Sequence, residues 1–440
     1  MRETKSIFFF AQHIAMTPNR ILLASALLLS TASGLWVEDA AKKSVAMGRV
    51  GRDPAPVPKY AFDLDAPPQE RWAPIAKDFT QYVPDVLAYL HAFLPPWAAP
   101  IVEAIAGDLT AYFPEYGDEM IGAAKALGMK TGDIVLVNLV YQIEHLGINC
   151  SNWNNTGPTV PDDPGCMAVD PNQEWCFCKA AGLEGGRTYA ATPRVSPDDG
   201  PGGPCTSVVA QASDGTIWHG RNLDWNLPPA LRKLVVDVDY QRGNETLFTA
   251  TTFVGFSGVL NGIRRGAGGK PGGWTVSMDA RGKGGKILYN LIEALATGAV
   301  TPSQRIRQAL EGGADFASAV TLLSSKPIVN EAYFVVGGAA AGEGVVIARD
   351  RNIAADRWYI NASETFYRLE TNYDRLEPVP VADDRRTPGN AHMDTLGQAG
   401  VGAAGMLSVM KQWPTFNHHT DYTGVFSAAN DMYTSMTWSD

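Results

Sequence analysis

The sequence predicts an α+β protein in which helices come first and antiparallel sheets follow. Residues 60–145 show helical apolar spacing broken by prolines, and residues 207–255 form short runs rich in Val, Thr and Phe. The later elements are predicted helices at 287–296, 302–308 and 314–323 and strands at 332–336, 344–348, 358–360 and 366–371. Runs of strands, then helices, then strands are typical of layered α+β domains.

The first 34 residues have the composition of a secretory signal. Arg20 precedes an apolar run over 21–29, and small residues follow it up to Gly34. A membrane span needs about 20 apolar residues, so a removable signal fits this run better than an N-terminal anchor, which is the alternative. We therefore predict a signal region over 1–34 and a lysosomal or secreted protein.

The composition and the net charge limit the kinds of partner that the chain could bind. The chain has 440 residues, of which 45% are hydrophobic and 19% charged, as in ordinary globular proteins. Lys and Arg total 36 against 46 Asp and Glu, which gives a formal charge of -10. The chain has no long basic run that could bind a polyanion, so we expect no nucleic-acid partner.

Residues 35–148 are predicted to form a helical N-terminal unit. The prolines at 84, 95 and 96 divide it into helices at 70–94, with a break at Pro84, then 97–113 and 117–127. An apolar stripe on these helices usually faces a core. A lipid-contacting face is the alternative, because Pro95-Pro96-Trp97 sets an aromatic side chain at a helix junction. Its candidate residues are Leu90, Phe93, Leu94 and Trp97.

Residues 149–204 are rich in Gly, Pro, Asp and Asn, and they are predicted to be an insertion or linker that ends at a domain boundary. Four of the five cysteines lie there, and an oxidising compartment would pair them as two disulfides with three possible connectivities. These are Cys150, Cys166, Cys176 and Cys178. A zinc site is the alternative, but paired C-x-x-C spacing is missing, so we predict no metal.

Four Asn-x-Ser/Thr triplets fit the same secretory route, although such triplets also arise by chance. They begin at Asn149, Asn154, Asn244 and Asn361.

Cys205 opens the strand-rich unit 205–440, directly after Pro201-Gly202-Gly203-Pro204. An N-terminal nucleophile must become the first residue of its chain, because its freed α-amine then serves as its base. Asp214-Gly215 predicts a hairpin turn that brings Arg221 near Cys205 to hold a thiolate, and Asp224 could orient the α-ammonium. A buried structural thiol beside an ordinary salt bridge is the alternative.

Several ordered motifs resemble the family of N-acylethanolamine-hydrolysing acid amidase and acid ceramidase. They are Cys205-Thr206-Ser207-Val208-Val209-Ala210, His219-Gly220-Arg221-Asn222-Leu223-Asp224, Thr371-Asn372-Tyr373-Asp374, Asp383-Asp384-Arg385-Arg386-Thr387 and, nearer the start, Phe62-Asp63-Leu64-Asp65, Glu70-Arg71-Trp72-Ala73-Pro74 and Val137-Asn138-Leu139-Val140-Tyr141. The segments Leu231-Arg232-Lys233-Leu234, Thr251-Thr252-Phe253 and Glu343-Gly344-Val345-Val346-Ile347 look closer to the acid amidase.

The resemblance implies a fold, a processing event and an activity. The fold would be an N-terminal-nucleophile αββα sandwich, made as a proenzyme and cut between Pro204 and Cys205 into two associated subunits. Cys205 would be the nucleophile that hydrolyses fatty-acid ethanolamides, with Arg221 and Asp224 around its α-amine. Asn372 would help bind the oxyanion, and Arg385 would support the site. No cofactor is implied.

Two features differ from the family pattern. The insertion 149–204 has little counterpart there, and Asp279-Ala280-Arg281 lacks the acidic side chain expected at Ala280. Two alternatives therefore accompany the ethanolamidase: a ceramidase-like lipid amidase, and a secreted lipid-binding relative that lost turnover. The helical N-terminal unit argues against an acylase acting on bile acids or penicillins. The expected partners are a lipid amide, a membrane or micelle surface, and the chain's own two fragments as a heterodimer.

Overall fold

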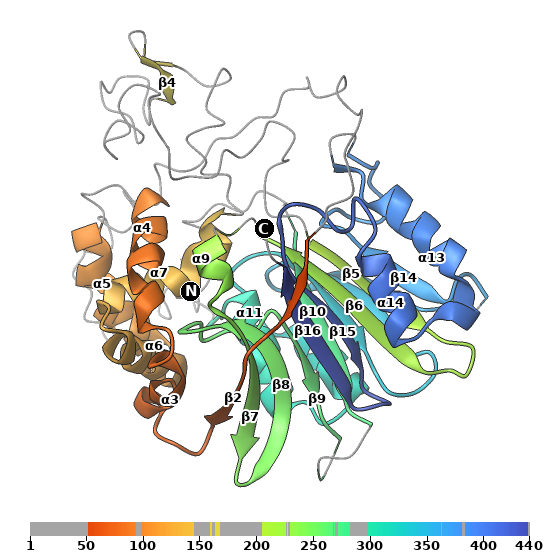
Figure 1. Ribbon diagram of the computed structural model, residues 1–440, viewed down its shortest axis with the longest axis horizontal. Helices are drawn as coiled ribbons and strands as arrows, with labels where there is room; N and C mark the ends of the chain where they lie inside the picture. Colours follow the sequence, from red (N-terminus) through yellow and green to blue (C-terminus); the bar gives the residue numbers. More distant parts are fainter. Residues whose placement is uncertain are drawn as a thin grey trace, which may run out of the picture.

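The computed structural model describes residues 52–93, 99–144, 159–160, 163–167 and 205–438, apart from 226, 228, 267, 269–271, 282–297, 362 and 381–382. Two central sheets lie face to face, and a helical N-terminal segment packs beside them (Figure 1). The α+β class predicted from the sequence is confirmed.

Helices dominate the described part of the N-terminal segment. They are η1 (Pro68–Glu70), α3 (Ala73–Ala76), η2 (Thr80–Tyr82), α4 (Val83–Phe93), α5 (Ala99–Tyr112), α6 (Pro114–Leu127) and α7 (Thr131–Glu144). Pro84 and Pro114 lie in the first turns of α4 and α6, where proline costs no helical hydrogen bond. Pro84 therefore helps to start a helix instead of breaking a longer one. Gly128, with φ of 70°, ends α6 in the left-handed conformation that glycine favours.

The six-stranded sheet carries Cys205. Its order is β1 (Pro54–Pro56), β16 (Met432–Trp438), β15 (Thr420–Ser427), β6 (Ile217–Asp224), β5 (Cys205–Gln211) and β14 (Tyr367–Glu370). All pairings in it are antiparallel. β5 and β6 form the predicted hairpin, in which Gly215 has φ of 91°. β15 and β16 occupy a region where the sequence analysis predicted no strand.

The eight-stranded sheet faces it. Its order is β13 (Ala354–Tyr359), β12 (Gly344–Arg349), β11 (Ala332–Gly337), β10 (Trp274–Ala280), β9 (Asn261–Arg264), β8 (Glu245–Phe253), β7 (Val235–Arg242) and β2 (Lys59–Asp63). A short helix, α9 (Pro229–Arg232), precedes β7, and β3 (Thr159–Val160) pairs with β4 (Asp163–Met167) as a separate hairpin. Only β2 runs parallel to its neighbour among the described strands of the large sheet.

Helices cover the outer face of each sheet and complete the αββα order that the family resemblance implied. α13 (Arg386–Gly400) and α14 (Ala403–Met410) lie on the six-stranded sheet, where Met406 and Met410 pack against Val208 and Val425. α11 (Pro302–Gly312) and α12 (Phe316–Ser325) lie on the eight-stranded sheet. Figure 1 shows α13 and α14 beside β14, β5 and β6 at the right of the molecule.

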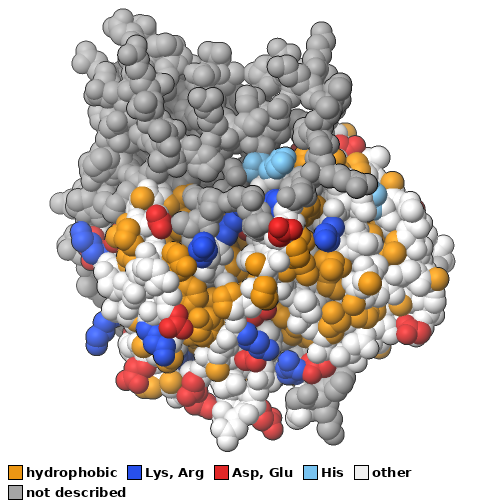
Figure 2. All heavy atoms as spheres, in the orientation of Figure 1, with side chains coloured by type: hydrophobic (Ala, Val, Ile, Leu, Met, Phe, Trp, Pro, Cys, Tyr) orange, Lys and Arg blue, Asp and Glu red, His pale blue; other side chains and the backbone are white. Residues whose placement is uncertain are grey.

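The surface carries both signs of charge. On the face in Figure 2, Lys and Arg side chains lie among Asp and Glu side chains, and hydrophobic side chains gather between them. Within the described ranges, no helix has the length and apolar composition needed to cross a membrane.

Candidate active site

Cys205 is the first residue of β5 and is buried, with 1% of its surface exposed. On the paired strand, Leu223 lies opposite Cys205 and Arg221 lies opposite Ser207. This register places Arg221 Nη2 3.5 Å from Cys205 Sγ. A guanidinium at this position favours the thiolate over the neutral thiol, because opposite charge nearby stabilises the ionised form.

The backbone of Cys205 is held from both sides. Its nitrogen donates to Asn372 Oδ1 at 2.6 Å, and Arg385 Nη1 donates to its carbonyl oxygen. Arg385 Nη2 also donates to Asn372 Oδ1 at 3.0 Å, while Asn372 Nδ2 donates to the Ala280 carbonyl at 2.9 Å. The structure therefore brings Cys205, Asn372 and Arg385 together and fixes the orientation of the Asn372 amide.

Arg385 directly precedes α13 and is almost fully buried. Burial alone lowers the pKa of Arg385, but its hydrogen bonds to Asp383, both at 2.7 Å, raise that pKa above its ordinary value. Arg385 is therefore a permanent cation with a fixed geometry.

Asp224 ends β6, one residue beyond the partner of Cys205. Its Oδ1 accepts from Thr420 Oγ1 at 2.5 Å, while its Oδ2 accepts no hydrogen bond from the described residues. Burial raises the pKa of Asp224 from 3.8 to about 7, although the positive charge of Arg385 opposes that rise. A buried oxygen without a donor costs free energy, so this position suits an added donor such as an α-ammonium.

Asp279 is a member of the site that the sequence analysis did not select. Its Oδ1 contacts Arg221 Nη1 and accepts from Ser207 Oγ at 2.8 Å, and neither Asp279 nor Arg221 is exposed to solvent. The signal in the sequence was the alternation of Thr275, Ser277 and Asp279 along an otherwise apolar strand.

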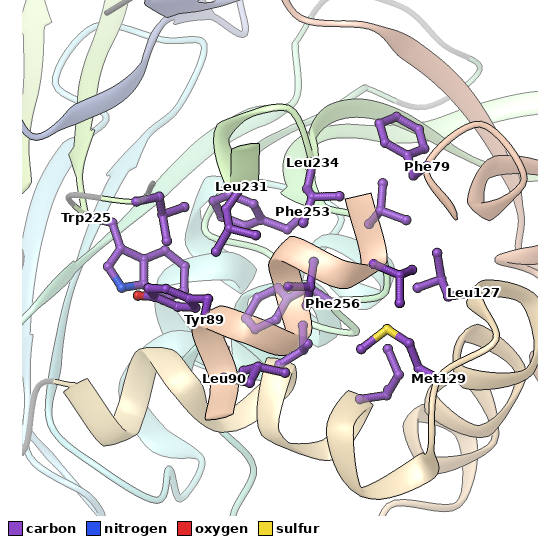
Figure 3. Close-up of a pocket in the computed structure, with 16 residues that line it drawn as sticks. Phe79, Tyr89, Leu90, Leu127, Met129, Trp225, Leu231, Leu234, Phe253 and Phe256 are labelled. Atoms are coloured by element: carbon purple, nitrogen blue, oxygen red, sulfur yellow. The ribbon is translucent and has the colours of Figure 1, made fainter. Parts of the chain in front are cut away.

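An apolar pocket lies between the N-terminal helices and the sheet-rich unit (Figure 3), and it encloses about 630 Å³ of atom-free space with its open mouth included. Side chains from both units line it: Phe79, Tyr89, Leu90, Leu127 and Met129 from the first, and Trp225, Leu231, Leu234, Phe253 and Phe256 from the second. Trp225 directly follows Asp224 in the chain, and Cys205 belongs to the same buried apolar cluster as Trp225 and Leu231. One wall of the pocket therefore begins directly after β6, the strand that pairs with the strand of Cys205.

Asp421 fixes the segment that connects the site to the pocket. Its carboxylate accepts from the backbone nitrogens of Trp225 at 2.9 Å and Leu227 at 3.2 Å, and from Arg232 Nε at 2.9 Å. Because all three bonds converge on one buried carboxylate, the wall formed by Trp225 and Leu227 is held in one position.

Known proteins match this chain over most of its length. Residues 55–113 match a family model described as the beta subunit of N-acylethanolamine-hydrolyzing acid amidase. The N-acylethanolamine-hydrolyzing acid amidase of Rattus norvegicus is 32% identical over 391 residues, which cover 87% of this chain and 89% of that protein. The chain belongs to the N-acylethanolamine-hydrolyzing acid amidase family.

The acid amidase branch is the nearer one, as the sequence motifs predicted. The acid ceramidase of Pan troglodytes is 26% identical over 446 residues, with 94% of each chain covered. A solved structure of the Caenorhabditis elegans acid amidase ortholog is 31% identical and covers 51% of this chain and 93% of its own, with a TM-score of 0.46.

In this member of the acid amidase family, the N-terminal segment is built into the sheet-rich unit. β1 extends the six-stranded sheet beside β16, and β2 extends the eight-stranded sheet beside β7. Phe62 of β2 packs against Tyr240 with ring centroids 4.9 Å apart. Apolar spacing in this segment predicts helices, and it gives no indication of these two strands.

A buried ionic cluster adds to the same junction. Glu119 of α6 accepts from Arg307 Nη2 of α11 at 2.6 Å and from Arg71 Nη1 at 2.7 Å. Glu119 and Arg307 are both 0% exposed. A fully buried charge is tolerated only when an opposite charge lies beside it. The cluster therefore holds α6 and α11, and with them the two units, together.

The structure describes some of the other predicted residues and leaves the rest outside the described ranges. Leu90 is 4% exposed and lines the pocket, so it does not lie on an outer lipid-contacting surface. The Phe93 side chain, Leu94 and Trp97 lie outside the described residues, as do Pro204, Cys150, Cys176, Cys178, Asn149, Asn154 and the Cys166 side chain. Asn244 and Asn361 are exposed. Within the described residues, no cluster of His, Cys, Asp and Glu has a metal-binding arrangement.

Proposed function

We propose that this chain is a cysteine N-terminal-nucleophile amidase that cuts itself between Pro204 and Cys205 and then hydrolyses N-acylethanolamines. The observation that carries the proposal is the arrangement at Cys205. Its sulfur lies 3.5 Å from Arg221, and its backbone nitrogen and oxygen are held by Asn372 and Arg385. A buried structural thiol needs none of these polar partners.

Self-cleavage needs only groups that the chain supplies, together with water. The Cys205 thiolate attacks the carbonyl carbon of Pro204, and the bond from that carbon to the Cys205 nitrogen breaks as the nitrogen takes up a proton. Water then hydrolyses the resulting thioester, which leaves a Pro204 carboxylate and a Cys205 with a free thiol and a free α-amine. Asn372 and Arg385 would hold the Cys205 backbone during these steps.

Amide hydrolysis repeats the chemistry on the substrate. The thiolate attacks the acyl carbonyl carbon, and the tetrahedral oxyanion is stabilised with help from Asn372, where one donor contributes about 3 kcal/mol. The Cys205 α-ammonium, oriented by Asp224, gives a proton to the departing ethanolamine nitrogen. Water then hydrolyses the acyl thioester to a fatty acid and restores the thiol.

The apolar pocket supports a lipid acyl group as the substrate part bound beside Cys205. Its walls are apolar side chains from both units, and a long alkyl chain gains about 0.8 kcal/mol for each methylene buried there. The ethanolamine head group would lie on the polar side, toward Asp224 and Arg385.

The decisive experiment compares the purified wild-type chain with Cys205→Ala. New N-termini are sequenced after incubation at acid and neutral pH, and fatty-acid ethanolamides, ceramides and bile-acid amides are assayed. We expect a fragment that begins at Cys205 and preferential ethanolamide hydrolysis in the wild type, and a single inactive chain in the variant. Faster ceramide turnover would assign the chain to the ceramidase-like alternative. Substrate binding without turnover by a cleaved protein would indicate a lipid-binding relative.

We further propose that the protein enters the secretory route to the lysosome or the exterior. The signal-like residues 1–34, the clustered cysteines and the exposed Asn244 and Asn361 support this route. Mass spectrometry of the non-reduced protein should find two disulfides among Cys150, Cys166, Cys176 and Cys178. Four free thiols or bound zinc would exclude that pairing.

Access to an insoluble substrate is the remaining part of the proposal. A lipid amide resides in membranes, so an enzyme gains by binding the interface through apolar side chains. Phe93, Leu94 and Trp97 remain the candidates from the sequence, and Phe93 and Trp97 carry the test. Replacing both with Ser should weaken liposome binding and long-chain turnover while a short soluble amide is still cleaved. Equal loss of both activities would indicate a core role instead.

A further inference from the structure

Three polar side chains interrupt the apolar core between the two sheets. Thr275, Ser277 and Asp279 alternate along β10, so they share the face that is turned toward the six-stranded sheet. Their neighbours Val276 and Met278 are buried in apolar surroundings. Polar groups at such positions cost free energy unless each finds a partner, so their placement requires a specific arrangement of partners.

Those partners form a continuous chain of hydrogen bonds from β10 to the active site. The ring nitrogens of His219 lie 3.1 Å from Thr275 Oγ1 and 2.9 Å from Ser277 Oγ. Ser277 Oγ donates to Ser207 Oγ at 2.8 Å, and Ser207 Oγ donates to Asp279 Oδ1 at 2.8 Å. All of these side chains are at most 1% exposed.

The last link of the chain reaches the nucleophile. Asp279 Oδ1 contacts Arg221 Nη1, and Arg221 Nη2 lies 3.5 Å from Cys205 Sγ. One guanidinium therefore bridges a fixed carboxylate and the reacting sulfur. Because a planar guanidinium has a rigid fork of donors, fixing one of its nitrogens fixes the direction of the other.

We propose that Asp279 is a positioning residue of the amidase, which holds the Arg221 guanidinium against the Cys205 sulfur and is itself fixed by the chain of Ser207, Ser277 and His219. The inference rests on the proposed function. Asp279 does not touch the reacting atoms. Its role is to keep the cation that stabilises the thiolate in one place.

The chain that supports Asp279 is electrically neutral. Burial, followed by the positive charge of Arg221, lowers the pKa of His219 to about 3. His219 therefore passes no charge toward Arg221 at working pH and acts as a rigid hydrogen-bonding spacer. Burial raises the pKa of Asp279, and its contact with Arg221 opposes that rise.

Other charged groups around Cys205 also influence the pH at which its thiol ionises. Among the described residues, the charged and titratable side chains around Cys205 and Asp279 include Arg221 and Asp224 on β6, Glu370 on β14, Arg385 before α13 and Tyr422 on β15. Asp279 stabilises the Cys205 thiolate only through its contact with Arg221. The variants must therefore leave the remaining groups unchanged.

The test measures the pH dependence of Cys205 alkylation by iodoacetamide, followed on the Cys205 peptide by mass spectrometry. Asp279→Ala removes the carboxylate that contacts Arg221 Nη1, whereas Asp279→Asn keeps an oxygen at that place. We expect the alkylation midpoint to rise toward about 8.5, the value of an ordinary thiol, in Asp279→Ala. In Asp279→Asn it should stay at or below the wild-type midpoint. The kcat of Asp279→Ala should fall about 100-fold with little change in KM.

Two further variants keep the test decisive. Asp237→Ala removes another buried carboxylate, bonded to Thr251 at 2.7 Å and Ser435 at 2.5 Å, and should lower stability without moving the midpoint. If Asp279→Ala does not fold, Ser207→Ala serves instead and should raise the midpoint. An unchanged midpoint, or an equal rise in Asp279→Asn and Asp279→Ala, overturns the proposal.

Alkylation needs no substrate, so it tests the placement of Arg221 separately from the amidase activity. A wild-type protein that hydrolyses no amide but shows the expected alkylation pattern would reject the proposed function alone.

Discussion

Asn372 accepts a hydrogen bond from the Cys205 backbone nitrogen at 2.6 Å, although 167 positions separate the two residues. Asn372 has φ of 78°, a left-handed conformation that non-glycine residues seldom adopt. Such a conformation costs on the order of 1–3 kcal/mol, so the surrounding structure must hold it in place. That cost is consistent with a side chain whose exact direction matters for the site.

Asn372→Gly separates the side chain from the backbone strain. Glycine adopts φ of 78° freely, so the variant should keep the fold while it loses the amide. We expect self-cleavage and kcat to fall about 100-fold to 1000-fold, as for loss of one oxyanion donor. The rates are measured by gel and by ethanolamide assay, with Asn372→Ala as the matched variant. If Asn372→Gly kept wild-type rates, the amide would have no role.

The buried cluster at Glu119 should dominate the stability of the junction between the two units. Glu119→Gln removes the fully buried carboxylate partner of Arg307 and leaves Glu311, whose side chain is 16% exposed, as its acidic partner among the described residues. We therefore expect the free energy of unfolding to fall by about 3 kcal/mol. Urea unfolding of the uncut Cys205→Ala chain measures it. The matched control is Glu115→Gln, whose carboxylate also pairs with Arg71 but is 50% exposed, and which should cost about 0–1 kcal/mol. Equal losses in both variants would contradict the prediction.

Stability should decline as the pH rises toward the alkaline side. Burial, followed by the negative charge of Asp279, raises the pKa of Glu370 from 4.5 to about 8. The folded chain keeps a proton that the unfolded chain releases, so this contribution is fully present below pH 4.5 and is lost as the pH rises through about 8. The raised pKa of Asp224, about 7, acts in the same direction.

Glu370→Gln provides the check on that pH dependence, because glutamine binds no proton in either state. Urea unfolding of the uncut Cys205→Ala chain between about pH 5 and 8 should give a flatter pH curve in the variant. Stability that rises with pH, or identical slopes in the two chains, would show that Glu370 does not carry the effect.

The apolar pocket should set acyl-chain preference. Leu231 is 5% exposed and lines the pocket, so Leu231→Trp fills part of it. We expect kcat/KM for long-chain ethanolamides to fall at least about tenfold while short-chain substrates are retained. Leu376→Trp, at a position 83% exposed, is the control and should change neither. Parallel loss of both substrates in Leu231→Trp would point to damaged folding.

The local parts of the site could be predicted from the sequence. Asp214-Gly215 predicted the turn, and the alternation on its two sides predicted the strands, so the pairing of β5 with β6 and the approach of Arg221 to Cys205 followed. Hairpin register depends on residues close in sequence, and side-chain alternation reports it directly. The motifs, which resemble one family in order and spacing, added the expectation that Asn372 and Arg385 belong to the same site.

The parts of the fold that sequence reasoning missed are one local hairpin, β15 with β16, and the non-local pairings of β1 with β16 and β2 with β7. β15 and β16 were not predicted, although β15 is buried between β16 and β6. Leu90 was considered for an outer lipid-contacting stripe, yet its side chain lines the internal pocket. Apolar periodicity shows that a face is buried but does not show against which partner.

By itself, the sequence determined the α+β order of elements, the Cys205 hairpin and the family to which the chain belongs. Only the tertiary structure decided that Arg385 would reach the Cys205 carbonyl across 180 positions, and that Asp279 on the opposite sheet would contact Arg221. Local spacing encodes which residues share a strand face. The contacts between sheets depend on how two separately formed surfaces pack, and that is fixed by the whole core at once.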